Sequence, residues 1–259
     1  MLPAIMHPES VPPENEWNHV GVNSPLWVIW WQGCESMPPL VQACYRNMLK
    51  HGGTHPVILI TQENWQEYCT IPAWIADKVH KGEIDLTHLT DLARLSLLSQ
   101  YGGIYLDSTL WLAADVPSYI ATYPFYTATV GASYLNNGKW ATFFQCSGAG
   151  NPLVQAVLDY HYAYWQHETS AIQYLMFDCM IMDIYQSSCW ARRMIDAVPA
   201  NNQNLYTMQQ QLNEPADTFN WCGTEQQWIQ KLQRRKQYRE LTENGQITVY
   251  GHMLELAQE

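Results

Sequence analysis

The sequence predicts an α/β fold in which helices cover a mostly parallel β-sheet, and three observations support this class. Residues 26–31 and 57–61 are continuous apolar runs, which is typical of strands that are buried on both faces. Each run is followed by a segment whose apolar residues recur at helical spacing. A long helix at 87–100 ends at a pair of glycines and leads directly into a third apolar strand, residues 104–106. Strands that alternate with helices in this way indicate βαβ units.

The remaining elements follow in chain order. Residues 1–24 are rich in Pro, Glu and Asn, so we expect an extended N-terminal segment before one domain of residues 25–259. Prolines at 38–39 and 152 mark helix starts, and the Asn-Gly pair in LNNGK predicts a turn between two aromatic-rich strands. We expect residues 199–222 to be irregular. The predicted helices are 38–50, 63–69, 73–80, 151–166, 170–185, 191–198 and 223–238, and the further strands are 124–130, 141–146 and 247–250.

Composition excludes several classes of protein. The chain has 259 residues, 47% of them hydrophobic, and a formal net charge of −11, which argues against disorder and against general nucleic-acid binding. It contains no apolar run of the roughly 18 residues that a membrane-spanning helix needs. Its seven cysteines show no metal-type spacing. Reduced thiols and the lack of a cationic leader predict a cytoplasmic protein.

The segment DLARLSLLSQYGGIYLDST, residues 91–109, carries the clearest chemical signal. Asp91 and Arg94 are three residues apart on the predicted helix, so they can share one face. Asp107 follows the third strand, and open α/β sheets bind ligands outside the carboxyl ends of their strands. One compact unit therefore offers a cation, an acid and a carboxylate suited to a metal, which favours a site for a sugar nucleotide.

This segment resembles the DXD-motif region of a family that contains capsular polysaccharide synthesis enzymes and sugar transferases. LWVIWWQGCESMPPLVQACYRNMLKHG (26–52) is similar to the first strand and helix of that family, and VILITQENWQEYCTIPAWI (57–75) to its second. The resemblance extends to the catalytic domains of the clostridial glucosylating toxins. It implies a GT-A (Rossmann-like) sheet with additional C-terminal helices. The similarity covers residues 26–112 well and the remainder poorly.

The resemblance also implies roles for individual residues. Asp107 would bind Mn²⁺ or Mg²⁺ between protein and diphosphate. Arg94 would face the diphosphate and the sugar, and Asp91 would accept hydrogen bonds from sugar hydroxyls. Two further residues would contact the metal. Thr109 stands where the family has a second acid, and it either positions a metal-bound water or fills a strand position. His252, near the C-terminus of the sequence, would be a metal or phosphate contact. The donor itself is expected to contact Trp30, Trp31, Gln32, Tyr105 and Ser108.

Two further groups of residues have competing interpretations. Asp178 and Asp183 are five residues apart on one predicted helix, so at most one is expected in the sugar pocket. The competing interpretation is that each is a solvated residue on the helix surface. The basic cluster of Lys231, Arg234, Arg235 and Lys236 is either a solvated helix face or a contact with anionic lipid.

The function implied by the resemblance is metal-assisted transfer of a hexose from a UDP-sugar to a surface polysaccharide or another glycan, with retention. The partners would be a nucleotide-sugar donor and a glycan or lipid-linked glycan acceptor, met in the cytoplasm or at the inner face of the membrane. The alternatives are a non-catalytic protein that binds a nucleotide sugar or glycan, which the acid missing at Thr109 keeps open, and a hydrolase of sugar nucleotides.

Overall fold

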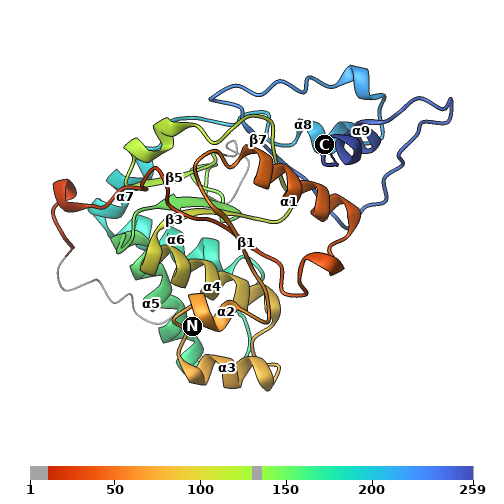
Figure 1. Cartoon of the computed structure of the whole chain (residues 1–259). Coiled ribbons are helices and arrows are strands. Elements are labelled where there is room, and N and C mark those ends of the chain that lie inside the picture. The colour runs from red at the N-terminus through yellow and green to blue at the C-terminus, as the bar shows by residue number, and fades with distance from the viewer. Residues whose placement is uncertain (1–10, 130–135, 259) are drawn as a thin grey trace.

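The computed structural model describes residues 11–129 and 136–258, and its centre is a five-stranded sheet in the order β2-β1-β3-β6-β5 (Figure 1). β1 is parallel to β2 and β3, while β6 is antiparallel to β3 and β5, so four strands run in one direction. All four residues of β1 and of β3 are buried, as expected for central strands covered on both faces. The strands are β1 (Leu26–Ile29), β2 (Val57–Ile60), β3 (Gly103–Leu106), β5 (Phe125–Thr127) and β6 (Phe144–Ser147).

Helices cover both faces of this sheet, which confirms the predicted α/β class. The chain moves outward from β1 to β2 and then back across β1 to β3, so right-handed crossovers place α1 and α4 on opposite faces. α4 packs against β1 and β3 and also against α5, and α6 packs on α5 (Figure 1). The helices are α1 (Pro39–His51), α2 (Trp65–Tyr68), α3 (Ala73–His80), α4 (Leu86–Tyr101), α5 (Pro152–His167), α6 (Met176–Ser187), α7 (Cys189–Asp196), α8 (Thr207–Gln211) and α9 (Val249–Leu256).

Capping side chains fix the start of the two longest helices. Asp85 accepts a hydrogen bond from the backbone N–H of His88 at 2.9 Å and begins α4. Asn151 accepts from the N–H groups of Leu153 and Val154 at 3.0 and 3.2 Å and begins α5. At the other end of α4, Gly102 and Gly103 both have positive φ, and Gly103 passes close to the backbone of Pro25. Glycine is needed there because a Cβ would collide with that carbonyl.

A second, two-stranded sheet pairs β4 (Leu110–Leu112) with β7 (Ile229–Lys231), and two segments near the C-terminus differ from the sequence prediction. Residues 223–238, expected to be a helix, contain β7 instead and then continue as a loop. Pairing with β4 determines the strand, and no local sequence signal reports that pairing. Residues 247–250, expected to be a strand, include the start of α9, because Thr248 accepts a hydrogen bond from the N–H of Gly251 at 3.0 Å and caps the helix.

The predicted turn around Asn-Gly is present, although the surrounding hairpin is not tight. Asn137 and Gly138 have φ values of 53° and 72°, and the N–H of Lys139 donates to the carbonyl of Asn136 at 3.2 Å, as in a type I′ turn. Residues 130–135 lie outside the described part of the chain. Short 3₁₀ helices complete the fold at Glu14–Glu16, Cys34–Ser36, Ser118–Thr122 and Ala216–Thr218.

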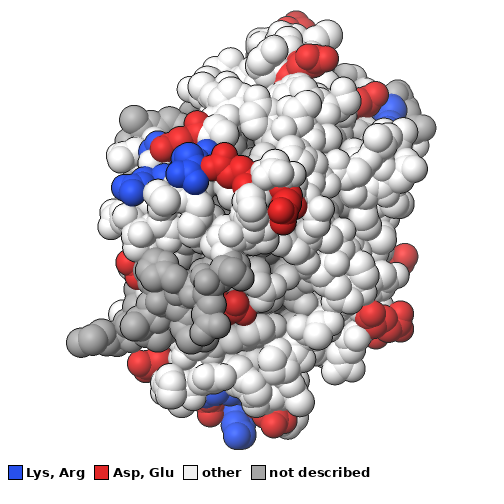
Figure 2. All heavy atoms as spheres, turned by 90° about the vertical axis from the view of Figure 1, so that its left-hand side faces the viewer, with Lys and Arg blue, Asp and Glu red and all other residues white. Residues whose placement is uncertain are grey.

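The surface carries few charges. Figure 2 shows one face on which acidic side chains are scattered and basic ones form small groups, with broad uncharged areas between them. In the part of the chain that the structure describes, no helix combines the length and the apolar composition needed to cross a bilayer. Each of the seven cysteines is a free thiol.

Candidate functional site

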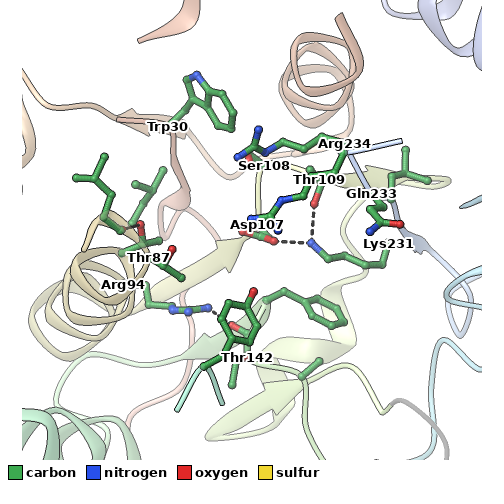
Figure 3. A pocket seen from close by; sticks show the side chains of 18 of the residues that line it. Trp30, Thr87, Arg94, Asp107, Ser108, Thr109, Thr142, Lys231, Gln233 and Arg234 are labelled. Atoms are coloured by element: carbon green, nitrogen blue, oxygen red, sulfur yellow. Dashed lines mark hydrogen bonds and ion pairs between the residues drawn. The ribbon is translucent and has the colours of Figure 1, made fainter. Parts of the chain in front are cut away.

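A cleft of about 820 Å³ opens at the carboxyl ends of β1 and β3 (Figure 3). These strands are parallel neighbours, so the residues that follow them emerge at one edge of the sheet. One wall comes from α4, and the opposite wall comes from the loop that follows β7. The lining residues that carry the argument are Trp30, Trp31, Gln32, Thr87, Thr90, Arg94, Asp107, Ser108, Thr109, Trp140, Thr142, Asp178, Lys231, Gln233, Arg234 and Arg235.

Asp107 and Thr109 are joined by a lysine from the far end of the chain. The ammonium of Lys231 forms an ion pair with Oδ2 of Asp107 and donates a hydrogen bond to Oγ1 of Thr109 at 2.5 Å. Figure 3 shows Lys231 reaching toward both residues from the β7 side of the cleft. The register of the small sheet explains this approach, since Lys231 lies directly opposite Leu110.

The local charges keep Asp107 ionised. Burial raises the pKa of this carboxyl. The Lys231 ammonium and, to a smaller extent, Arg94 lower the pKa by more than burial raises it, so the net pKa lies below the ordinary value. The hydroxyl of Tyr105 also donates weakly to Oδ1 at 3.5 Å. Tyr105 itself is buried beneath the cleft rather than lining it, and burial raises its own pKa. It therefore supports Asp107 from behind.

Arg94 reaches the cleft, whereas Asp91 stays buried. The two form an ion pair on α4, with side-chain exposures of 10% and 7%. The Arg94 guanidinium also donates to the carbonyl of Thr142 and lies 5.0 and 4.7 Å from the ring centroids of Tyr105 and Phe177. These contacts hold the guanidinium in one place at the cleft wall. Asp91 does not line the cleft, so the structure does not place it where sugar hydroxyls would bind.

The two tryptophans after β1 have different environments. Trp31 is buried, and its indole N–H donates to Oγ1 of Thr90 at 2.7 Å, so the ring is fixed within the core. Trp30 is only partly buried, and the guanidinium of Arg234 lies 5.3 Å from its ring centroid. Gln32 is exposed at the cleft. Of this predicted group, Trp30 has the aromatic surface most available to a base.

Only one of the two aspartates on α6 lies in the cleft. Asp178 lines it and accepts a hydrogen bond from the indole N–H of Trp140 at 3.0 Å. Burial raises the pKa of Asp178 above its ordinary value, and the Trp140 hydrogen bond opposes this only in part. Asp183 instead accepts from the hydroxyl of Tyr160 at 2.6 Å and does not line the cleft.

The structure does not bring His252 to the site. His252 lies on α9, where its ring contacts Trp221 at 4.9 Å between centroids and Nδ1 lies 3.2 Å from Glu255. Conversely, Lys231, Arg234 and Arg235 line the cleft, although the sequence placed them on a helix. Ile229 and Gln230 are both buried, and this short strand forms by pairing with β4, which no local pattern in the sequence reports.

The described residues do not fit a resident divalent cation. Mg²⁺ at a diphosphate is held by one or two carboxylates, waters and phosphate oxygens, and residues 11–129 and 136–258 contain no group of three or more Asp, Glu, His or Cys side chains that could hold the ion without a diphosphate. Asp107 provides one carboxylate, Thr109 provides a neutral hydroxyl, and Lys231 contacts both. Any metal that arrived with a diphosphate would meet this ammonium.

The cleft is positive although the chain is acidic. Its described lining contains four cations, Arg94, Lys231, Arg234 and Arg235, against two carboxylates, Asp107 and Asp178. The whole chain has a formal net charge of −11. A local excess of positive charge in a concave, low-dielectric site concentrates anionic ligands.

Comparison with known proteins gives one family match. The model of a family described as "Capsular polysaccharide synthesis protein" matches residues 10–253. No curated protein matches the chain in sequence. Among solved structures, a chain named "PaToxG Glycosyltransferase" aligns with a TM-score of 0.48 and 14% identity, covering 71% of this chain and 81% of that one.

Proposed function

The chain belongs to the capsular polysaccharide synthesis protein family, and from this membership and the charge of its cleft we propose that it transfers a hexose from a nucleotide sugar to a glycan. The donor we propose is a UDP-sugar, and the acceptor is a surface polysaccharide or a lipid-linked glycan. The observation that carries the proposal is the group of four cations in the cleft at the carboxyl ends of β1 and β3, namely Arg94, Lys231, Arg234 and Arg235. A nucleoside diphosphate is the anion whose length and charge suit such a group.

The reaction replaces one bond at the anomeric carbon of the sugar. The bond from that carbon to the diphosphate oxygen breaks, and its electron pair goes to the diphosphate. The acceptor hydroxyl oxygen forms the new bond, and its proton is taken up by the departing diphosphate. Arg94, Lys231 and Arg234 would stabilise the negative charge that develops there. Transfer with retention is the stereochemistry that the resemblance implies.

Other residues would orient the donor. Trp30 would stack on the uracil ring, and the backbone at Gln32 would contact its polar edge. Asp178 is a carboxylate that lines the cleft, and we assign to it the sugar-hydroxyl contact that the resemblance implies for Asp91. Ser108 and Thr109 would lie beside the diphosphate.

The mouth of the cleft suits an acceptor that carries a lipid. Leu86, Tyr174 and Leu175 line the cleft and are 45%, 77% and 45% exposed. Exposed apolar side chains of this size at a binding site favour contact with an apolar partner. We therefore propose that the acceptor is met at a membrane surface; the cytoplasm and the inner face of the membrane stay predictions.

The test is calorimetric titration of UDP, first in EDTA and then with Mn²⁺, followed by turnover of UDP-hexoses. We expect UDP to bind with a Kd in the micromolar range and UDP release to increase when a glycan acceptor is present. UDP release that is equally fast without acceptor would identify a hydrolase instead. Tight UDP binding with no turnover of any hexose would identify a non-catalytic binder. Absence of binding by every nucleoside diphosphate would contradict the proposal.

Metal assistance, which the resemblance implies, stays a prediction that the EDTA arm tests. Asp107 would be the carboxylate that holds the cation. Lys231, which contacts both Asp107 and Thr109, is a different source of positive charge at the same position.

A further inference from the structure

We propose that Lys231 supplies, from within the chain, the positive charge that the resemblance assigns to a divalent cation, so that the donor diphosphate binds without metal. This inference rests on the proposed function, because it concerns the same donor site. It departs from the expectation of Mn²⁺ or Mg²⁺ at Asp107. It also gives a physical reason for a threonine at position 109.

The lysine is held in place by several independent contacts. Its backbone pairs with Leu110 in the small sheet, and its N–H donates to the carbonyl of Leu205 at 2.7 Å. Its ammonium lies 5.1 Å from the ring centroid of Phe143, and the side chain is 18% exposed. A long side chain fixed in this way has already lost most of its conformational freedom. It therefore resembles a built-in ligand-binding group rather than a mobile surface lysine.

The ammonium and a metal would compete for the same oxygens. Lys231 contacts Oδ2 of Asp107 and Oγ1 of Thr109, which are the protein oxygens that a cation at this motif would use. A bound Mg²⁺ needs oxygens at about 2.0–2.1 Å in octahedral geometry, which leaves no space for an ammonium between them. Displacing Lys231 would leave a partly buried ammonium without its carboxylate, which is unfavourable.

Threonine at position 109 fits the lysine better than an acid would. A hydroxyl accepts one hydrogen bond from the ammonium without adding negative charge. Asp107 and Thr109 then hold two of the three N–H groups of the ammonium, and the one left remains for a phosphate oxygen. Arg94, Arg234 and Arg235 add positive charge along the same cleft. A second acid at 109 would cancel part of this charge and favour a metal instead.

The test compares UDP and uridine binding by calorimetry in EDTA and in Mn²⁺. For the unaltered protein we expect the UDP affinity to differ by no more than about twofold between the two buffers. Lys231→Gln removes a charge-assisted contact and is expected to weaken UDP binding about 10- to 100-fold. Uridine, which has no phosphate, should bind both proteins equally. Lys236→Gln is the matched control, because Lys236 is exposed on the same loop and does not line the cleft.

A reciprocal variant tests the competition directly. Thr109→Asp combined with Lys231→Gln places two carboxylates together and removes the ammonium, so we expect it to bind Mn²⁺ in a paramagnetic resonance titration. The unaltered protein should leave the Mn²⁺ signal unchanged. If Lys231→Gln does not fold, as judged by its thermal unfolding, Lys231→Arg replaces it, and its affinity for UDP in EDTA should remain within about tenfold of the original.

Any of three results would overturn the inference and leave the proposed function intact. They are UDP binding that requires Mn²⁺, binding of Mn²⁺ by the unaltered protein in the absence of UDP, and full UDP affinity of Lys231→Gln in EDTA. Absence of binding by any nucleoside diphosphate in either buffer would instead overturn the proposed function.

Discussion

Asp91 and Arg94 form an ion pair one helical turn apart on α4, and only Arg94 lines the cleft. The pair is nearly inaccessible to solvent, with side-chain exposures of 7% and 10%. Asp91 holds the Arg94 guanidinium against the rings of Tyr105 and Phe177, so under the proposed function it would act on the donor through Arg94. This arrangement assigns Asp91 to positioning rather than to direct contact with a sugar.

Replacing Asp91 by alanine should reduce both stability and donor binding. Removing one partner of a buried ion pair costs about 3–5 kcal/mol, because the other charge stays buried without compensation. We expect chemical denaturation to show a loss of this size and UDP affinity to fall, with uridine affinity unchanged. Glu14→Ala breaks an exposed pair with Arg193 and should change the stability much less, because solvent screens exposed charges. Equal effects of the two variants would contradict this role of Asp91.

Substitutions at the adjacent Trp30 and Trp31 should change different properties, donor binding for Trp30 and stability for Trp31. Trp30→Ala is expected to weaken UDP binding about tenfold, because base–aromatic stacking contributes about 1–3 kcal/mol, and to change the unfolding temperature little. Trp31→Ala removes a core indole and its hydrogen bond to Thr90, and should cost about 3–5 kcal/mol of unfolding free energy. Calorimetry and denaturation of both variants measure the two effects. The assignment fails if Trp30→Ala binds UDP normally.

Asp178→Asn should stabilise the protein at neutral pH while reducing turnover. The pKa of Asp178 is raised in the folded state, so the unfolded carboxyl loses its proton at lower pH and ionisation opposes folding. Asparagine stays neutral and can still accept the Trp140 hydrogen bond. The gain in unfolding temperature should be present at pH 7 and should shrink as the pH falls toward the ordinary pKa of 3.8. A variant less stable than the original at pH 7 would contradict this sign.

Alanine substitutions at two glycines with positive φ measure how much the close approach at the junction of α4 and β3 contributes. Gly103 lies at this junction, and Gly245 is the control. Gly103→Ala would place a methyl group against the carbonyl of Pro25, in addition to straining a φ of 107°. Gly245 has a φ of 80° but nothing within 4 Å of the added methyl group. We expect Gly245→Ala to cost about 1 kcal/mol from backbone strain alone and Gly103→Ala to cost clearly more, as measured by denaturation. Similar losses would show that the close approach at Gly103 carries little energy.

The sequence predicted the sheet well because its central strands are marked by local signals. β1, β2 and β3 are apolar runs, and the glycine pair before β3 and the proline at the start of α1 give clear boundaries. Residues 229–231 and 248–250 were misassigned because tertiary contacts decide their structure: β7 depends on pairing with β4, and Thr248 acts as a cap rather than as a strand residue.

The candidate site was predicted where it is local in sequence and missed where it is not. Arg94, Asp107, Ser108, Thr109 and the residues after β1 do meet in one cleft, because parallel strands end at one edge. Lys231 lies 124 residues beyond Asp107, and no pattern within either segment links them. Asp91, Tyr105 and His252 do not line the cleft, and the roles of the residues that do remain predictions.

The separation between Asp107 and Lys231 also sets an order of events during synthesis. All five strands of the central sheet lie within residues 26–147, so a nascent chain can pair them before the segment that carries β7 has left the ribosome. Such a chain would have Asp107 in place but would lack Lys231, Arg234 and Arg235. Under the proposed function, nucleotide capture would therefore begin only after the segment that carries β7 has emerged and paired with β4.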